Sequence, residues 1–329
     1  MSPQQASKKR KHFFLAYIWL LLILLTLLTV ASYTWFALSR TPKVSDMNMY
    51  VTVGNGMEIA LKHDSLIWGQ QLDFADMCGN HAPLRPVTWS DQDQRFYAGV
   101  YGYDGRLTGQ WDPLTDEQNA NKSDENGYYC MGTFYARTDQ PVNVSLAAAA
   151  TSTDYHEGHG TYLIGTPVWN AETVSHDNAG VGAECAVRMG IRITPIDKEG
   201  NPTGKTPVFY IYEPNANVHL DGTRGYISTP SIDGPEHLVS EDRILAQTVT
   251  DWVEAYPVQR DVLIYKMGEF TGDTFLFRLE TNEMVKIDLY IWLEGQDVDC
   301  TNMIQNAQIL ANFQLVAETG GQSGMVPIG

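Results

Sequence analysis

The stretch YYCMGTFYARTDQPVNVSLA, residues 128–147, gives the clearest evidence for the fold class. Its first half alternates, with Cys130 and Phe134 on the same side of the chain. A period of two is typical of a strand that buries one face. Asp139-Gln140 provides a turn, and a second strand is predicted at residues 141–147. The stretch therefore predicts two β-strands joined by a tight turn.

Alternation of this kind recurs along the chain after residue 42. It predicts strands at residues 47–53, 57–61, 95–101, 183–193, 207–212, 262–265, 274–279, 285–293 and 309–316. Gly54-Asn55-Gly56 predicts a hairpin between the first two strands, and one helical turn or a short helix is expected around Leu238–Trp252. Because no strand–helix–strand rhythm appears, we predict an all-β protein, an antiparallel β-sandwich or jelly roll, over residues 39–318. A flexible tail is expected at residues 319–329.

An uncharged apolar segment of 26 residues, Phe13–Leu38, precedes the predicted strands. About 20 apolar residues suffice to cross a bilayer as a helix. The basic run KKRK at residues 8–11 lies directly before the segment, and such flanks stay in the cytoplasm. We therefore expect a cytoplasmic N-terminus at residues 1–12, a transmembrane helix at residues 13–38 that contacts the lipid bilayer, and an extracellular domain.

The same segment also has features of a secretory signal. Thr29-Val30-Ala31 fits a small-x-small cleavage site, and cleavage there would leave Ser32 at the new N-terminus. The apolar part of a signal usually spans about 7–15 residues, so the greater length of this segment favours an uncleaved anchor. A long signal segment remains the alternative.

The chain beyond residue 40 is strongly acidic. It contains 17 Lys and Arg against 39 Asp and Glu, a net charge of −22. Nucleic acids and anionic lipids attract basic surfaces, so neither is an expected partner of this part.

Four cysteines, Cys78, Cys130, Cys185 and Cys300, all follow the apolar segment. Outside a cell such cysteines usually form disulfides, and none has the spacing of a zinc site. Four cysteines allow three pairings. The pairing expected here is Cys78–Cys130 with Cys185–Cys300, because each bond would join neighbouring strand ends.

Three carboxylates, Glu294, Asp297 and Asp299, lie within six residues at the end of a predicted strand. Calcium takes six to eight oxygen ligands, so this cluster and the acidic loop at residues 112–125 are candidate Ca²⁺ sites. The alternative is a turn with solubilising charge. His156 and His159 are three residues apart beside glycines, which favours a solvated loop over a helical zinc site.

The sequence offers no catalytic constellation. It lacks a Gly-x-Ser-x-Gly elbow and a phosphate-binding glycine loop, so we predict neither enzymatic activity nor a bound cofactor. Five aromatic residues are candidates for a sugar-binding platform, with core packing as the alternative: Trp68, Trp89, Trp111, Tyr101 and Tyr103. A carbohydrate site would need two carboxylates facing one cleft beside exposed tryptophans.

Short stretches of the chain resemble known surface proteins. The junction Ala31-Ser32-Tyr33-Thr34-Trp35-Phe36 is similar to that of the camelysin/TasA-type surface proteins of Gram-positive bacteria. Residues 126–129, 134–138, 142–144 and 291–300 resemble uncharacterised membrane-anchored surface proteins of Firmicutes. The resemblance implies a jelly-roll-like extracellular domain, and in the TasA type such domains form biofilm fibres by strand addition.

This chain departs from the TasA type because it is longer, has four cysteines and keeps an anchor-like segment. We therefore predict a membrane-anchored structural or adhesive surface protein, with other surface proteins or further copies of itself as partners. One alternative is a biofilm-fibre-type subunit that assembles by strand addition after signal cleavage. The other is a carbohydrate-binding ectodomain.

Overall fold

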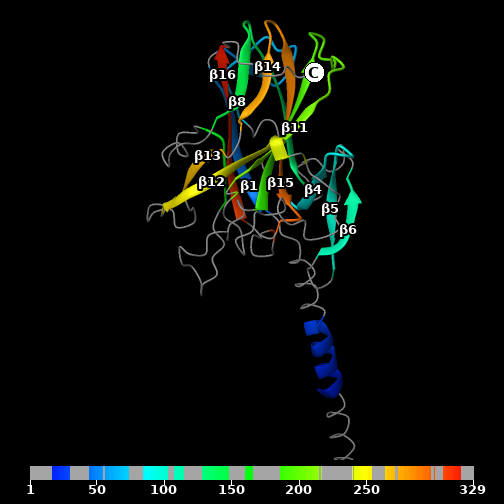
Figure 1. The fold of residues 1–329 in the computed structure, drawn as a ribbon. Helices are drawn as coiled ribbons and strands as arrows, with labels where there is room; N and C mark the ends of the chain where they lie inside the picture. The colour runs from blue at the N-terminus through cyan, green and yellow to red at the C-terminus, as the bar shows by residue number, and fades with distance from the viewer. Residues whose placement is uncertain are drawn as a thin grey trace, which may run out of the picture.

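The protein is mostly β-sheet, as predicted from the sequence (Figure 1). The computed structural model describes residues 17–29, 44–54, 56–73, 84–102, 107–114, 128–147, 160–165, 186–214, 216, 239, 241–253, 264–270, 273–297, 300 and 307–319. Within these residues the strands extend from β1 to β16, and they form two sheets.

The smaller sheet has six strands in the order β14-β8-β16-β1-β3, with β9 paired to β16. Their bounds are β14 Phe275–Leu279, β8 Val142–Leu146, β16 Ala307–Thr319, β1 Val44–Val53, β3 Gln71–Asp73 and β9 Tyr162–Gly165.

The larger sheet has ten strands in the order β13-β12-β11-β10-β15-β4-β5-β6, and β7 pairs with both β15 and β2. Their bounds are β13 Ile264–Phe270, β12 Ile244–Val253, β11 Val208–Glu213, β10 Val187–Ile196, β15 Met284–Glu294, β4 Pro86–Ser90, β5 Arg95–Tyr101, β6 Leu107–Pro113, β7 Cys130–Arg137 and β2 Glu58–Ala60.

The prediction of purely antiparallel sheets is wrong, because both sheets are mixed. Strand β1 runs parallel to β16, β11 parallel to β12, and β15 parallel to β4. The β1–β16 pair joins the first and last strands, so no local turn constrains their relative direction. Jelly-roll topology and the predicted domain bounds stay predictions.

The predicted hairpin after β1 is also wrong. Strand β1 belongs to the smaller sheet, whereas β2 pairs with β7 in the larger one. At the crossing, the amide of Gly54 donates to the carbonyl of Leu315 at 3.0 Å. Gly56 has a φ of +96°, which glycine adopts without steric cost. The glycines therefore carry the chain between sheets instead of closing a two-strand turn.

Where one helical turn or a short helix was expected, around Leu238–Trp252, the described residues contain one helical turn followed by strand β12. A single 3₁₀ turn, η2 Glu241–Arg243, precedes this strand. Strand β12 pairs with β11 on one side and β13 on the other. Tertiary pairing here overrides local helix propensity.

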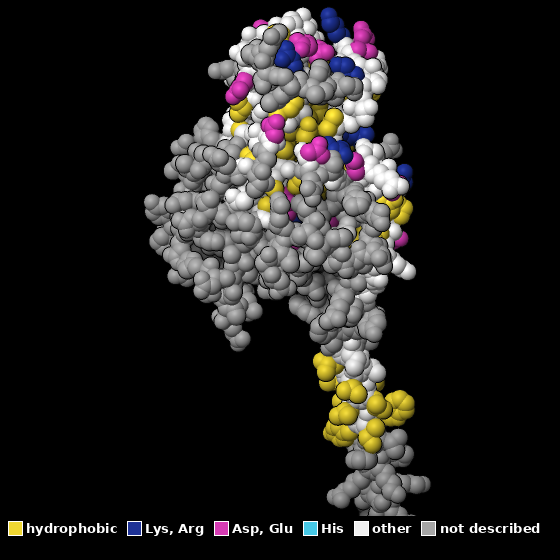
Figure 2. Space-filling view, in the orientation of Figure 1, with side chains coloured by type: hydrophobic (Ala, Val, Ile, Leu, Met, Phe, Trp, Pro, Cys, Tyr) yellow, Lys and Arg dark blue, Asp and Glu magenta, His cyan; other side chains and the backbone are white. Residues whose placement is uncertain are grey.

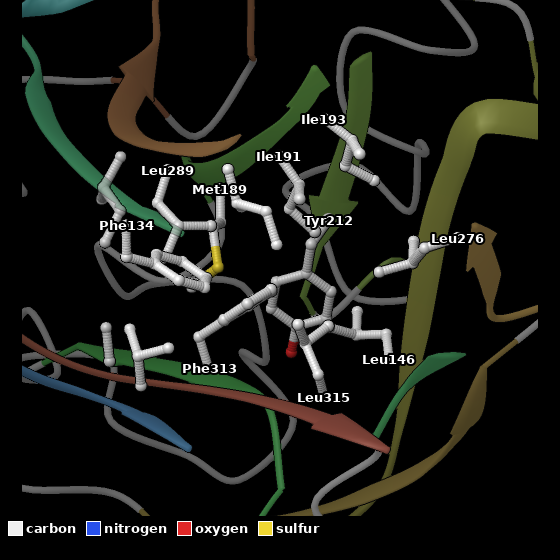
Figure 3. Packing of buried hydrophobic residues seen from close by; sticks show 14 of the residues in the cluster. Phe134, Leu146, Met189, Ile191, Ile193, Tyr212, Leu276, Leu289, Phe313 and Leu315 are labelled. Atoms are coloured by element: carbon white, nitrogen blue, oxygen red, sulfur yellow. The ribbon is translucent and has the colours of Figure 1, made fainter. Parts of the chain in front are cut away.

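A main core fills the space between the two sheets (Figure 3). Strand β10 contributes Val187, Met189, Ile191 and Ile193, which are completely buried, as the alternation in the sequence predicted. Phe313 and Leu315 of β16 face them from the smaller sheet, and both are also completely buried. The two sheets thus pack against each other across one continuous apolar layer.

The opposite face of the larger sheet carries a second, aromatic cluster. It consists of Trp89, Phe96, Tyr129, Phe209, Tyr290 and Trp292, with smaller apolar residues around them. The rings of Trp89 and Phe209 stack with centroids 4.1 Å apart and an angle of 7° between planes. Trp89 lies on β4 and Phe96 lies on β5. The β4–β5 pair therefore covers this face of the larger sheet.

An α-helix at residues 17–29 lies N-terminal to the strands, and every one of its residues is exposed (Figure 2). Leu21 and Leu24 are 69% and 64% exposed. Among the residues that the structure describes, no helix combines the length and apolarity needed to cross a bilayer. Residues 13–16 and 30–38 of the predicted segment lie outside the described residues, and its membrane insertion stays a prediction.

The close packing beneath the aromatic cluster predicts that Gly190 tolerates no side chain. A Cβ at this position would lie 2.5 Å from Phe209 Cζ and 3.0 Å from Trp292 Cζ3. Overpacking of this kind costs about 1–3 kcal/mol. Gly190→Ala should therefore lower the free energy of unfolding by about that amount in urea denaturation of the full-length protein.

The matched control is Gly69→Ala, where a Cβ would meet no atom within 4 Å. Its unfolding midpoint should stay close to that of the wild type. Equal stability of the two variants would contradict the packing described here.

Candidate functional site

The predicted calcium ligands lie in a polar cluster that is buried where β15 ends. The polar cluster consists of Thr88, Arg188, Glu213, Glu294, Gln296 and Asp297, which are all at most 5% exposed. These residues come from β4, β10, β11 and β15 and from the turn after β15. Buried charges are stable only when they are paired and hydrogen-bonded, so their partners define what the cluster can do.

Arg188 is the centre of the polar cluster. Its Nη2 donates to Glu213 Oε1 at 3.1 Å and also to Asp297 Oδ2. Its Nη1 donates to the carbonyl of Val187 at 3.0 Å. One guanidinium therefore holds two carboxylates that are 84 residues apart in the sequence, which links β10, β11 and the turn after β15.

Glu294 lies beside this ion-pair network but has its own partners. Trp292 Nε1 donates to Glu294 Oε2 at 3.0 Å, and the amide of Gln296 donates to Oε1 at 3.1 Å. Burial raises the pKa of Glu294 from 4.5 to about 7, against smaller lowering effects of these hydrogen bonds and of Arg188. The folded protein therefore holds a proton on this carboxyl at mildly acidic pH.

This arrangement does not match the calcium site considered for Glu294, Asp297 and Asp299. Arg188 already neutralises Asp297, and Glu294 accepts from protein donors. Asp299 lies outside the described residues. Within the described ranges, no group of three His, Cys, Asp or Glu side chains is placed to hold a metal ion. The polar cluster thus links strands, and all of its members are buried.

The remaining predicted residues are only partly placed. Cys130 is buried at the start of β7 and is disulfide-bonded, and Cys300 is half-buried against the main core. Cys78 and Cys185 lie outside the described residues, as do His156 and His159, so the pairing Cys78–Cys130 with Cys185–Cys300 stays a prediction.

The described surface contains an open groove of about 580 Å³ at the ends of β2, β7 and β15. We name it the Arg137 groove. Two carboxylates, two cations, two amides and two thioethers line it: Glu58, Asp139, Arg137, Lys198, Gln70, Asn282, Met57 and Met284. A concave site with converging polar groups is the usual setting for a small ligand.

Three chain crossings between the two sheets build this groove. They are the turns from β1 to β2, from β7 to β8 and from β14 to β15. Thr138 Oγ1 donates to the carbonyl of Gly56 at 2.8 Å, and the amide of Asn282 donates to the carbonyl of Thr138 at 3.1 Å. These bonds hold the three turns together at one end of the structure.

Arg137 is held in a fixed position within the groove. Its Nε and Nη2 both donate to Glu58 Oε2, at 3.0 and 2.7 Å. Its guanidinium carbon lies 4.1 Å from the centroid of the Trp68 ring, which is a cation–π distance. The Arg137 side chain is still 42% exposed, so it remains accessible from solvent.

The three tryptophans considered as a sugar platform have different surroundings. Trp89 is buried in the aromatic cluster, and half-buried Trp111 packs near Gly295. Half-buried Trp68 lies against Arg137 beside a groove with two carboxylates, Glu58 and Asp139. The groove brings two carboxylates together, but the other half of the requirement, exposed tryptophans beside them, is not fulfilled there, because Trp68 is half-buried and does not line the groove.

An apolar tip lies on the loop between β2 and β3, next to Trp68. Leu66 is fully exposed and Ile67 is 83% exposed. Ser65 fixes this turn, because its hydroxyl donates to the carbonyl of Ile67 at 2.6 Å and accepts from the amide of Ile67 at 3.1 Å. The turn therefore presents two large apolar side chains to solvent in a defined conformation.

Comparison with known proteins finds no relative whose residues could be compared with these sites. No protein-family model, no curated protein and no solved structure matches this chain. The resemblance to camelysin/TasA-type proteins stays a prediction.

Neither the Arg137 groove nor the apolar tip was predicted from the sequence. The groove residues belong to separate turns, so no local motif connects them. The Leu66-Ile67-Trp68 run after Ser65 is an apolar triplet inside a polar loop, and this local contrast could have indicated the tip.

The raised pKa of Glu294 predicts a specific pH dependence of stability. Between pH 4.5 and about 7 the folded protein binds one more proton than the unfolded chain. The contribution of Glu294 to the free energy of unfolding should therefore be largest below pH 4.5 and fall by about 3 kcal/mol as the pH rises to 7. Glu294→Gln, which cannot ionise, should lose this slope in urea denaturation measured from pH 4.5 to 8.

The matched control is Glu199→Gln, because Glu199 is exposed in the turn between β10 and β11. This variant should keep the wild-type slope. A slope that is identical in the wild type and Glu294→Gln would refute the assignment to Glu294.

Proposed function

We propose that this chain is a membrane-anchored extracellular surface protein with a structural or adhesive role. The observation that carries the proposal is the helix at residues 17–29, whose apolar side chains are all exposed. Apolar surface gains about 25 cal/mol per Å² when it leaves water, so a helix that is apolar on every side favours a lipid environment. In the anchored form the segment 13–38 crosses the bilayer as one helix.

The distribution of charge supports this orientation. The basic run at residues 8–11 favours the cytoplasmic side, so the remainder of the chain, with its net charge of −22, is placed outside. Repulsion from anionic lipid headgroups keeps such a domain off the membrane surface. The β-sheet domain then extends from the cell, in a jelly-roll-like arrangement, as the exposed part of the protein.

The place of β1 favours the anchored form over a fibre subunit. Strand donation requires a terminal strand that can leave its own sheet. Strand β1 is paired on both edges, with β16 on one side and β3 on the other. The residues from Tyr50 to Thr52 take part in both ladders, so donation would break two sets of hydrogen bonds.

The apolar tip supports the adhesive role. Large exposed apolar residues that are adjacent and fixed by hydrogen bonds are typical of contact sites. Leu66 and Ile67 contribute little to the folded domain, because they are almost completely exposed. Their place on a rigid turn suits them to insertion into an apolar surface on another molecule.

The anchor is tested with charges placed in the helix. Leu22→Lys together with Leu25→Lys should release the chain from membranes or prevent its insertion, since each lysine at the bilayer centre costs about 2.5–3.5 kcal/mol. The measurement is the membrane fraction after alkaline carbonate extraction of cells expressing the full chain. Leu22→Ile with Leu25→Ile is the control and should remain in the membrane.

Intact mass and N-terminal sequencing of the wild-type protein separate the anchor from a signal. A chain that retains residues 13–38 is expected. A mature N-terminus at Ser32 would contradict the anchor and favour the secreted, fibre-type subunit.

The adhesive role is tested at the tip. Leu66→Ser with Ile67→Ser should reduce the retention of expressing cells on octyl-coated beads several-fold. The free energy of unfolding should change by no more than about 0.5 kcal/mol, because these side chains are exposed. Lys62→Ser with Asp64→Ser, on the same loop, is the control and should retain adhesion. Unchanged retention of the tip variant would exclude Leu66 and Ile67 as the adhesive contact.

A further inference from the structure

We propose that the Arg137 groove binds a neutral, hydroxyl-rich ligand of the oligosaccharide class. This inference concerns a different part of the molecule from the helix and the apolar tip, and it does not depend on membrane anchoring.

The dimensions of the groove fit a short oligosaccharide. Its volume of about 580 Å³ lies within the range of about 300–1,000 Å³ that is usual for small-molecule sites.

The charges along the described lining balance. Glu58 and Asp139 carry two negative charges, and Arg137 and Lys198 carry two positive charges. Glu58 and Arg137 already neutralise each other through two hydrogen bonds. The groove therefore attracts neither anions nor cations as a class, which favours a ligand without net charge.

The hydrogen-bonding groups of the lining match those of sugar hydroxyls. A hydroxyl donates one hydrogen bond and accepts up to two. The carboxylate of Asp139 can only accept and the ammonium of Lys198 can only donate, whereas the amide of Asn282 does both. Met284, which is half-buried, adds a polarizable apolar surface for the C–H face of a sugar ring.

The groove is also organised before a ligand arrives. The bond to Glu58 and the contact with Trp68 fix Arg137, and the contacts among Gly56, Thr138 and Asn282 fix the surrounding turns. Side chains that are already ordered lose little conformational entropy on binding. Such preorganisation matters for sugars, because each hydroxyl exchanges a bond to water for one to protein.

The test is titration calorimetry of the full-length protein in detergent with defined tetrasaccharides. Cellotetraose, chitotetraose and maltotetraose are the neutral probes, and tetragalacturonate and tetralysine are the charged comparisons. At least one neutral probe should bind, with an affinity that does not change with salt concentration, because a neutral ligand is not subject to ionic screening.

Two exposed groove residues then locate the site. Asp139→Ala and Lys198→Ala should each weaken binding of that probe about tenfold, the effect expected for a lost hydrogen bond to a charged group. Lys205→Ala is the matched control, because Lys205 is an exposed lysine in the same β10–β11 connection that lines a different depression. It should leave the affinity unchanged.

Several results would overturn the proposal. One is the absence of binding by all three neutral probes up to about 10 mM, a concentration that would reveal even contacts of a few kcal/mol. Another is binding of tetragalacturonate or tetralysine alone. A third is binding of a neutral probe that Asp139→Ala and Lys198→Ala leave unchanged, because this would place the site elsewhere.

Discussion

The structure depends on one constraint: strand β15 must bury both of its faces. Val285, Ile287, Leu289, Ile291 and Leu293 enter the main core, while Tyr290 and Trp292 enter the aromatic cluster on the other side. A strand buried on both faces needs a cover on each. The smaller sheet covers one face, and the β4–β5 pair covers the other. The strand also pairs with β10, β7 and β4, so it joins most of the larger sheet.

The polar cluster follows from the same constraint. At the end of β15, Glu294 follows Trp292 by two residues and therefore lies on the same face of the strand. The β4–β5 pair excludes water from this face, so the Glu294 carboxyl is buried. Burial raises the pKa of Glu294, so its carboxyl binds a proton more tightly. At the adjacent position of β10, Arg188 neutralises the charges of Glu213 and Asp297. Buried ion pairs add little stability relative to apolar residues, but removal of one partner is costly. The cluster is therefore sensitive to the loss of any one of its charged partners.

The sequence predicted the strands far better than their partners. Alternation is a local property, so β7, β8, β10, β11, β15 and β16 were found near their observed positions. Pairing depends on distant segments, so the parallel β1–β16 ladder and the crossing after β1 were missed. The same limit applies to the sites. Glu294 and Asp297 appeared as possible metal ligands because Arg188, more than 100 residues earlier, is not visible as their neighbour in the sequence.

The Arg137 groove shows why a surface site forms at this end of the sheets. Three segments leave one sheet for the other there, and a segment that crosses cannot continue its ladder. The side chains of a crossing segment do not have to alternate between a buried and an exposed face. Polar residues such as Asp139 and Asn282 can therefore line the same groove. The backbone adapts at the same points, with a positive φ at Gly56 and at Asn282. Because the paired strands on either side are rigid, these turns can present functional groups without weakening the core. A substitution in the groove should therefore alter ligand contacts while the two-sheet fold persists, and this separation makes the site accessible to mutational tests.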